Sequence, residues 1–137
     1  MTRIVQVLFA VFFFFANANV MAGELSYTCE VTHIYKLSND GSLGISPFEK
    51  QMKGSSFSVS RVTGEIIGTI IGEVIPTLMS KSTKVVNHGS TKSSFKAVAD
   101  FGNQFQIIEV KEFLKATVKP FVSSSMGGAG IVTGLCK

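Results

Sequence analysis

The stretch that decides the fold is residues 25–37, Leu-Ser-Tyr-Thr-Cys-Glu-Val-Thr-His-Ile-Tyr-Lys-Leu. Successive side chains of a β-strand point to opposite faces, so this alternation predicts a long strand with one buried and one solvent-facing side. Ile34 alone breaks the alternation. The face predicted to be buried comprises Leu25, Tyr27, Cys29, Val31, His33, Tyr35 and Leu37.

Cys29 lies on this face, and the only other cysteine is Cys136, one residue before the C-terminus. Two cysteines in an exported chain indicate a disulfide rather than a metal or redox pair. No Cys-x-x-Cys motif is present. We therefore predict a Cys29–Cys136 bond that ties the first strand to the last. The chain-entropy estimate for a loop of this length is about 4–5 kcal/mol.

Residues 1–22 have the layout of a secretory signal peptide. Arg3 supplies a positive charge, Ile4–Ala16 is an apolar run, and the small residue Ala22 precedes Gly23. A transmembrane helix needs about 20 apolar residues, so this run is short for a membrane anchor. Cleavage after Ala22 would leave a single domain, residues 23–137, in the periplasm or outside the cell. An uncleaved N-terminal anchor is the alternative.

Lysines are scattered along the chain, whose net charge of +4 would fall to +3 when Arg3 leaves with the signal peptide. Domains that bind nucleic acid concentrate arginine and stacking aromatic residues in a basic patch. Here Arg61 is the only arginine after the predicted cut, so we expect no nucleic-acid partner. We also expect no stable membrane insertion after cleavage, although the positive charge alone favours weak attraction to an anionic envelope surface.

Alternating segments with frequent turns predict roughly seven to nine short strands, typical of an antiparallel β-sandwich or small β-barrel. Ser55–Val62 and Glu65–Ile71 form a predicted hairpin around Thr63-Gly64. A short helix or a membrane-inserting segment is the alternative there, because three glycines are spaced by four residues. The other predicted strands are Val85-Val86, Ser93–Asp100, Gln104–Val110 with a bulge, Thr117–Val122 at an edge because of Pro120, and Ile131–Cys136.

Small and polar residues mark the connections between these strands. Ile45–Gly54 and Ser123–Gly130 are predicted loops, and a short helix is an alternative at Lys111–Lys115. The predicted core comprises Leu25, Tyr27, Val31, Phe57, Val59, Phe95, Ile107 and Ile131.

No arrangement of residues points to catalysis. The chain has no Gly-x-Ser-x-Gly motif, its nine acidic residues are dispersed, and its glycine-rich stretch lacks the lysine of a phosphate-binding loop. A zinc site needs three or four ligands, and Cys29 is already assigned to the disulfide. We therefore expect no catalytic residue, no cofactor and no metal.

Arg61 and His88 are the candidate binding residues. Arg61 continues the inward face of the predicted hairpin, where it would pair with a carboxylate such as Glu65 or Asp100, or contact a ligand. His88 lies in a predicted turn and is expected to be exposed. His33 is expected to be buried, because it shares the apolar face of the first strand.

The pattern Phe57-x-Val59-x-Arg61-x-Thr63-Gly64-x-x-x-Gly68, with Ser94-Phe95-Lys96 and the closing Thr133-Gly134-x-Cys136, resembles a set of small exported proteins of Gram-negative bacteria. This resemblance implies an exported β-domain and no particular activity. In size, export signal and terminal cysteines the chain is also similar to the periplasmic inhibitors of c-type lysozyme, which are small β-barrels. It does not carry their Ser-Gly-x-x-Tyr loop.

These observations predict a non-enzymatic envelope protein that binds another protein or a surface polymer through strand edges and the two loops. A carrier for a small apolar ligand is one alternative, suggested by twelve phenylalanines, five of which belong to the signal peptide. A lysozyme-inhibitor-like protein is another alternative, and an enzyme is the least favoured.

Overall fold

The structure is a computed structural model that describes residues 25–68, 82–102, 105–126 and 130–137. The predicted signal peptide, residues 1–22, lies outside the described residues. Nine strands and one helical turn are described: β1 (Ser26–Leu37), β2 (Leu43–Ile45), α2 (Glu49–Met52), β3 (Ser56–Ser60), β4 (Ile66–Gly68), β5 (Ser82–Ser90), β6 (Ser93–Asp100), β7 (Phe105–Val110), β8 (Lys119–Met126) and β9 (Ile131–Cys136).

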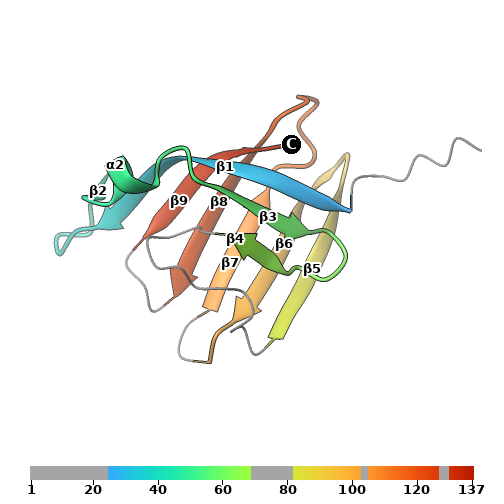
Figure 1. The fold of residues 1–137 in the computed structure, drawn as a ribbon, viewed down its shortest axis with the longest axis horizontal. Coiled ribbons are helices and arrows are strands. Elements are labelled where there is room, and N and C mark those ends of the chain that lie inside the picture. Colours follow the sequence, from blue (N-terminus) through green and yellow to red (C-terminus); the bar gives the residue numbers. More distant parts are fainter. Residues whose placement is uncertain (1–24, 69–81, 103–104, 127–129) are drawn as a thin grey trace, which may run out of the picture.

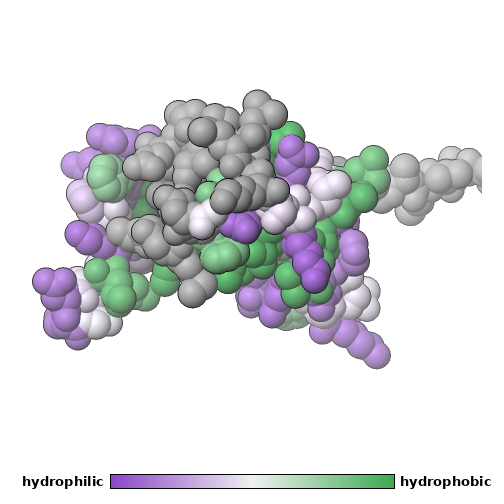
Figure 2. Space-filling model, turned by 90° about the horizontal axis from the view of Figure 1, so that it is seen from below, coloured by the Kyte–Doolittle hydropathy of each residue, from purple (hydrophilic) through white to green (hydrophobic). Residues whose placement is uncertain are grey.

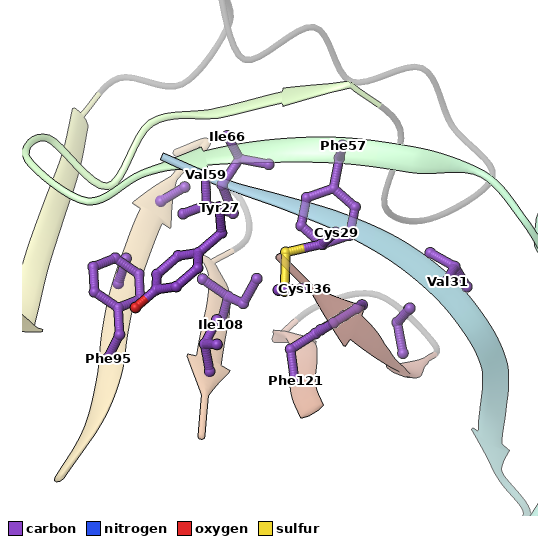
Figure 3. Packing of buried hydrophobic residues seen from close by; sticks show 14 of the residues in the cluster. Tyr27, Cys29, Val31, Phe57, Val59, Ile66, Phe95, Ile108, Phe121 and Cys136 are labelled. Atoms are coloured by element: carbon purple, nitrogen blue, oxygen red, sulfur yellow. A yellow bond between two sulfur atoms is a disulfide. The ribbon is translucent and has the colours of Figure 1, made fainter. Parts of the chain in front are cut away.

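All nine strands belong to one antiparallel sheet in the order β4-β3-β1-β9-β8-β7-β6-β5, with β2 also paired to β1. The sheet curls so that β1 and β3 pass across its other strands (Figure 1). Edge-to-face contacts of Tyr27 with Phe95, and of Phe57 with Phe121, join strands that are not hydrogen-bonded neighbours (Figure 3). The predicted all-β antiparallel fold is confirmed, as a half-barrel.

The predicted disulfide is confirmed and lies in the middle of the sheet. Cys29 of β1 and Cys136 of β9 are directly opposite each other and bonded, and both are buried. The next residues continue the pairing, since Thr28 and Lys137 exchange two backbone hydrogen bonds of 2.8 and 3.1 Å. The bond therefore covalently links the N-terminal and C-terminal strands where they are neighbours.

A bulge in β1 overturns part of the predicted inward face. The register with β9 shifts between Val31 and His33, so one extra residue is inserted and the side chains that follow change faces. Ile34 is consequently buried, whereas His33 and Leu37 are exposed. The prediction that His33 is buried was therefore wrong, and the break at Ile34 was the sign of the bulge.

The predicted core was correct for five of its eight residues, because Tyr27, Val31, Phe57, Val59 and Phe95 are buried. Leu25 was wrongly placed in the core: it precedes the first paired residue of β1 and is 71% exposed.

Ile107 and Ile131 were also wrongly placed in the core, and their neighbours Ile108 and Val132 are buried instead. The predicted bulge in β7 was wrong too, since β7 pairs with β6 and β8 without a register shift. Two adjacent apolar residues leave the inward face ambiguous, and pairing with the neighbouring strands decides it.

β8 differs from its prediction in position and length. Pro120 was expected at an edge, but β8 lies between β7 and β9. Proline is tolerated because Pro120 is near the start of β8 and lies opposite Lys111, where β7 has already ended. The Lys111 amide still donates a hydrogen bond to the Pro120 carbonyl oxygen. Ser123–Gly130 was predicted to be a loop, but this was wrong for its first part, because β8 continues to Met126.

Ser123 is buried on the inner face of β8, and its hydroxyl donates to the Ile107 carbonyl oxygen at 3.0 Å.

Two other predicted connections can be compared with the structure. Ile45–Gly54 contains the end of β2 and the turn α2 rather than loop alone, and Lys111–Lys115 forms turns without a helix.

The predicted hairpin is confirmed as β3 paired with β4 up to Gly68. The rest of its second strand, to Ile71, lies outside the described residues. Gly64 in the turn has a φ of +77°, and a Cβ added there would lie 3.1 Å from both Ala97 Cβ and the Lys84 carbonyl carbon. The β3–β4 turn therefore packs directly on β5 and β6, which brings the two ends of the sheet together.

Candidate functional site

The curl brings the two predicted binding residues together. Arg61 follows β3, whereas His88 lies on β5, and these strands are not neighbours in the sheet. The His88 ring nitrogen Nδ1 nevertheless lies 3.2 Å from the Arg61 carbonyl oxygen. His88 is exposed, as predicted, but it belongs to a strand rather than a turn.

Arg61 does not pair with Glu65 or Asp100, the carboxylates suggested from the sequence. Its Nη2 lies 3.5 Å from Oε1 of Glu112, in the connection between β7 and β8. Its guanidinium carbon lies 4.9 Å from the centre of the Tyr27 ring, within the range of a cation–π contact. Both charged side chains are about a quarter exposed, at 31% and 20%, so water screens the ion pair only in part.

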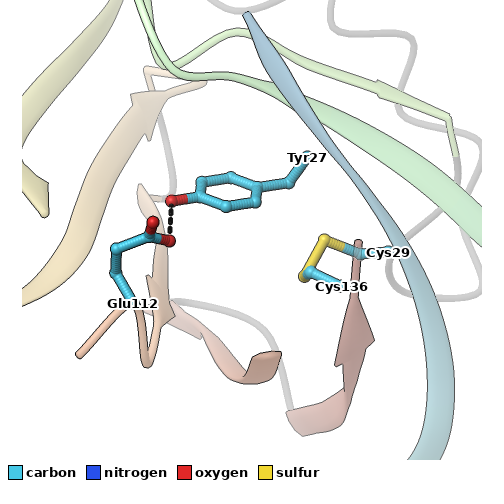
Figure 4. Close-up of a disulfide and its surroundings, with 4 residues drawn as sticks. All are labelled: Tyr27, Cys29, Glu112 and Cys136. Carbon is cyan, nitrogen blue, oxygen red and sulfur yellow. Dashed lines mark hydrogen bonds between the residues drawn. A yellow bond between two sulfur atoms is a disulfide. The ribbon is translucent and has the colours of Figure 1, made fainter. Parts of the chain in front are cut away.

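Tyr27 completes this cluster by donating a hydrogen bond of 2.5 Å from its hydroxyl to Oε2 of Glu112 (Figure 4). Tyr27 is on β1, Arg61 follows β3, and Glu112 follows β7. We call these three residues the latch, because they hold together three segments that are distant in the chain. The Lys119 ammonium also donates to the Glu112 and Leu114 carbonyl oxygens, which fixes the connection around Glu112.

The sequence identified Arg61 but missed its partners. Tyr27 was predicted only as a core residue, and Glu112 lies in an exposed stretch with no apolar periodicity. Nothing local marks Glu112, because its role depends on two segments that are more than 50 residues away in the chain.

The latch is suited to holding structure rather than to catalysis. Both carboxylate oxygens of Glu112 already have partners, and the Tyr27 side chain is almost fully buried. Within the described residues, no three His, Cys, Asp or Glu side chains gather closely enough to hold a metal ion. The same residues include no helix that is long and apolar enough to cross a membrane.

The latch makes folding stability sensitive to alkaline pH. Burial, followed by the hydrogen bond to Glu112, raises the pKa of Tyr27 above its ordinary value. The unfolded chain ionises its tyrosines above about pH 10, whereas folded Tyr27 keeps its proton. The latch contribution is therefore fully present below about pH 10 and is lost as the pH rises toward the folded-state pKa.

A Tyr35→Phe variant would test this prediction, because Tyr27 is then the only tyrosine in the chain. We expect the phenolate absorbance to appear only as the protein unfolds in alkali. Tyr27→Phe should flatten the fall in stability over the same pH range. A phenolate that titrates near pH 10 in the folded protein would contradict the prediction.

A second candidate site lies at the other end of the molecule, on what we call the arm (residues 35–48). Leu37 pairs with Leu43 and Tyr35 pairs with Ile45, so these four side chains share the outer face. Leu37, Leu43, Ile45 and Phe48 are 63%, 55%, 60% and 57% exposed. Figure 1 shows the arm projecting at the far left, and in Figure 2 hydrophobic residues lie beside the hydrophilic turn at that end.

The outer face of the arm continues across the sheet. Strand registers align one cross-strand row, which we call the outer row, consisting of Ile45, Tyr35, Ile131, Ser124, Ile107 and Val98. None of these six residues is charged, although the register continues the row to Lys84 on β5, and Ile45 and Ile107 are exposed. Because neighbouring strands are about 4.8 Å apart, the row is roughly 24 Å long.

No protein-family model, no curated protein and no solved structure matches this chain. Its function must therefore be inferred from the described residues themselves.

Proposed function

We propose that this chain is an exported, non-enzymatic envelope protein that binds another protein through the arm. The observation that carries the proposal is the group of four apolar side chains on the arm, each more than half exposed. Scattered exposed apolar residues are normal, but a contiguous apolar surface rimmed by polar residues is typical of an interaction site. The outer row extends that surface toward β6.

The interior gives less support to the alternative of a carrier for an apolar ligand. Side chains from β1, β3, β6 and β8 contact one another across it, including the Tyr27–Phe95 and Phe57–Phe121 ring pairs. The carrier and the lysozyme-inhibitor-like protein stay predictions, for which the described residues provide no specific observation.

Export is supported by the disulfide, since such bonds persist in oxidising compartments outside the cytoplasm. We expect the protein recovered from the periplasm or the medium to begin at Gly23 and to contain the oxidised Cys29–Cys136 pair. Intact mass measured with and without reductant after denaturation tests both points. A retained Met1 would contradict signal cleavage, and two free thiols would contradict oxidation.

Site-specific photo-crosslinking tests the role of the arm. A photoreactive amino acid at Phe48 should yield a discrete cross-linked protein in the cell envelope. Leu43→Ser with Ile45→Ser should lower that yield at least tenfold, because each substitution removes an apolar contact worth about 1 kcal/mol and a tenfold change needs about 1.4 kcal/mol. The matched control is the same probe at Val86, which is similarly exposed, at 58%, but lies on β5.

The same cross-linked protein at both positions would contradict specific binding by the arm. A yield that the double serine variant leaves unchanged would contradict it as well. Unfolding curves of all variants should match the parent protein, since each altered side chain is exposed.

A further inference from the structure

The end of the half-barrel opposite the arm gathers cations and apolar side chains. It is formed by the start of β1, the β3–β4 turn and the β5–β6 turn, which lie at the right of Figure 1, and by the β7–β8 connection at the top of that view. We call it the cationic end. Among the described residues, its charged side chains include the cations Arg61, Lys92, Lys111, Lys115 and Lys119 and the carboxylates Glu65, Glu109 and Glu112.

Contacts between these four segments hold the cationic end together. The Arg61 amide donates to the Leu25 carbonyl oxygen at 2.8 Å, which places the β3–β4 turn beside the start of β1. The latch attaches Arg61 to Glu112 in the β7–β8 connection. A Cβ added to Gly89 would lie 3.1 Å from the Glu112 Cβ, so the β5–β6 hairpin also packs against that connection.

Two of the three carboxylates, Glu109 and Glu112, are in ion pairs, whereas exposed Glu65 and two of the lysines are in none of the ion pairs of the described residues. Glu112 pairs with Arg61, and Glu109 pairs with Lys111 at 2.6 Å. The Lys111 ammonium lowers the pKa of Glu109 below its ordinary value, which keeps that carboxylate charged. Among the ion pairs of the described residues, none involves Lys92 or Lys115, and both lysines are exposed.

Apolar side chains project from the tips of the same segments. Leu25 is at the start of β1, Val62 is in the β3–β4 turn, and Phe113 and Leu114 are adjacent in the β7–β8 connection; all four are exposed. The ends of that connection are held by the Lys111–Pro120 hydrogen bond and by Lys119. Phe113 and Leu114 are therefore presented on a fixed support between Lys111 and Lys115.

We propose that the cationic end docks on an anionic phospholipid surface. Exposed lysines near such a surface each contribute about 1 kcal/mol of attraction, and apolar side chains that enter the headgroup region add to it. The apolar residues sit on separate tips interspersed with cations, which suits a fluid surface better than a shape-complementary protein. This inference is independent of the arm, and docking by this end would leave the arm directed away from the lipid.

Vesicle co-sedimentation of the exported protein tests the inference, once intact mass has shown that the apolar N-terminal run is absent. We expect binding to vesicles of phosphatidylglycerol and phosphatidylethanolamine, weakened by salt, and no binding to vesicles of phosphatidylcholine alone. Lys115→Gln should weaken binding roughly fivefold. Phe113→Ser with Leu114→Ser should weaken it at least about tenfold.

Lys53→Gln, at an exposed position after α2, and Val86→Ser, at an exposed position on β5, are the matched controls and should leave vesicle binding unchanged. The arm variant Leu43→Ser with Ile45→Ser should also bind vesicles normally, so failure of the arm and failure of the cationic end are distinguishable. No binding to the anionic vesicles, equal binding to neutral ones, or equal losses from the matched controls would each overturn the inference.

Discussion

Replacement of Gly134 by alanine is expected to destabilise the folded protein by about 3 kcal/mol or more. A Cβ at this position would overlap the Glu30 carbonyl oxygen and lie 2.6 Å from Cε1 of Phe121. The Glu30 oxygen belongs to the backbone of β1 beside Cys29, so it cannot move without disturbing the centre of the sheet. The Phe121 ring is buried against Phe57 and has no room to retreat.

Gly44→Ala is the matched control for this substitution. Gly44 also lies in a strand, and a Cβ there would meet nothing closer than the Ser38 hydroxyl at 4.0 Å. Urea unfolding of both variants should show a large loss for Gly134→Ala and a change within about 0.5 kcal/mol for Gly44→Ala. Similar losses in the two variants would show that backbone freedom, rather than the close contact, accounts for the effect.

Loss of the disulfide is expected to cost about 2–5 kcal/mol, a large part of the stability of a domain of this size. The bond restricts the unfolded chain across a sequence separation of 107 residues. It also joins β1 to β9 at the centre of the sheet, where both sulfurs are buried. Cys29→Ala with Cys136→Ala should therefore shift the denaturant midpoint strongly downward.

Unfolding of the reduced parent protein measures the effect of the bond alone, because both sulfur atoms are still present and only the bond between them is lost. Most of the loss should appear in the reduced parent, and the alanine pair should add a smaller cost for the cavity. The oxidised protein should resist reductant while folded, since the bond is inaccessible. An unchanged midpoint after reduction would contradict a stabilising role for the disulfide.

The sequence predicted best those features that depend on local pattern. The bounds predicted for Ser93–Asp100 match β6, and Phe95 is buried as predicted, together with Ala97 and Ala99 on the same face. The second half of β6 follows the two-residue period of a strand without interruption, so its sequence indicates a single inward face. The hairpin around Gly64 was also predictable, because a turn residue separates an alternating segment from one that is rich in isoleucine.

Predictions of facing failed where the pattern was ambiguous or interrupted. Ile107-Ile108 and Ile131-Val132 each offer two adjacent apolar residues for one inward position. In β1 the bulge changes the inward face after Val31, which exposes His33 and Leu37. The exposure of Leu37 on the arm is a direct result of this change of face, since the sequence alone had placed Tyr35 and Leu37 on the buried face of the strand.

The residues of the candidate sites also divide into those that the sequence predicted and those that only the structure identified. Arg61 and His88 were predicted, but Glu112 and Tyr27, the groups that contact the Arg61 side chain, were found only in the structure. Phe113 and Leu114 likewise had no visible role until the β7–β8 connection was seen beside the β3–β4 turn. These neighbours come from segments separated by dozens of residues, which no local pattern connects.

By itself, the sequence determined the antiparallel β class, the disulfide partners and the β3–β4 hairpin, because alternation, turn residues and a single pair of cysteines are local or unique features. The tertiary structure alone decided the inward face of β1 beyond the bulge, the partner of Arg61, the outer row and the grouping of charges at the cationic end. Those features depend on strand register and on the curl of the sheet, which are set by contacts between distant segments rather than by the order of residues within any one of them.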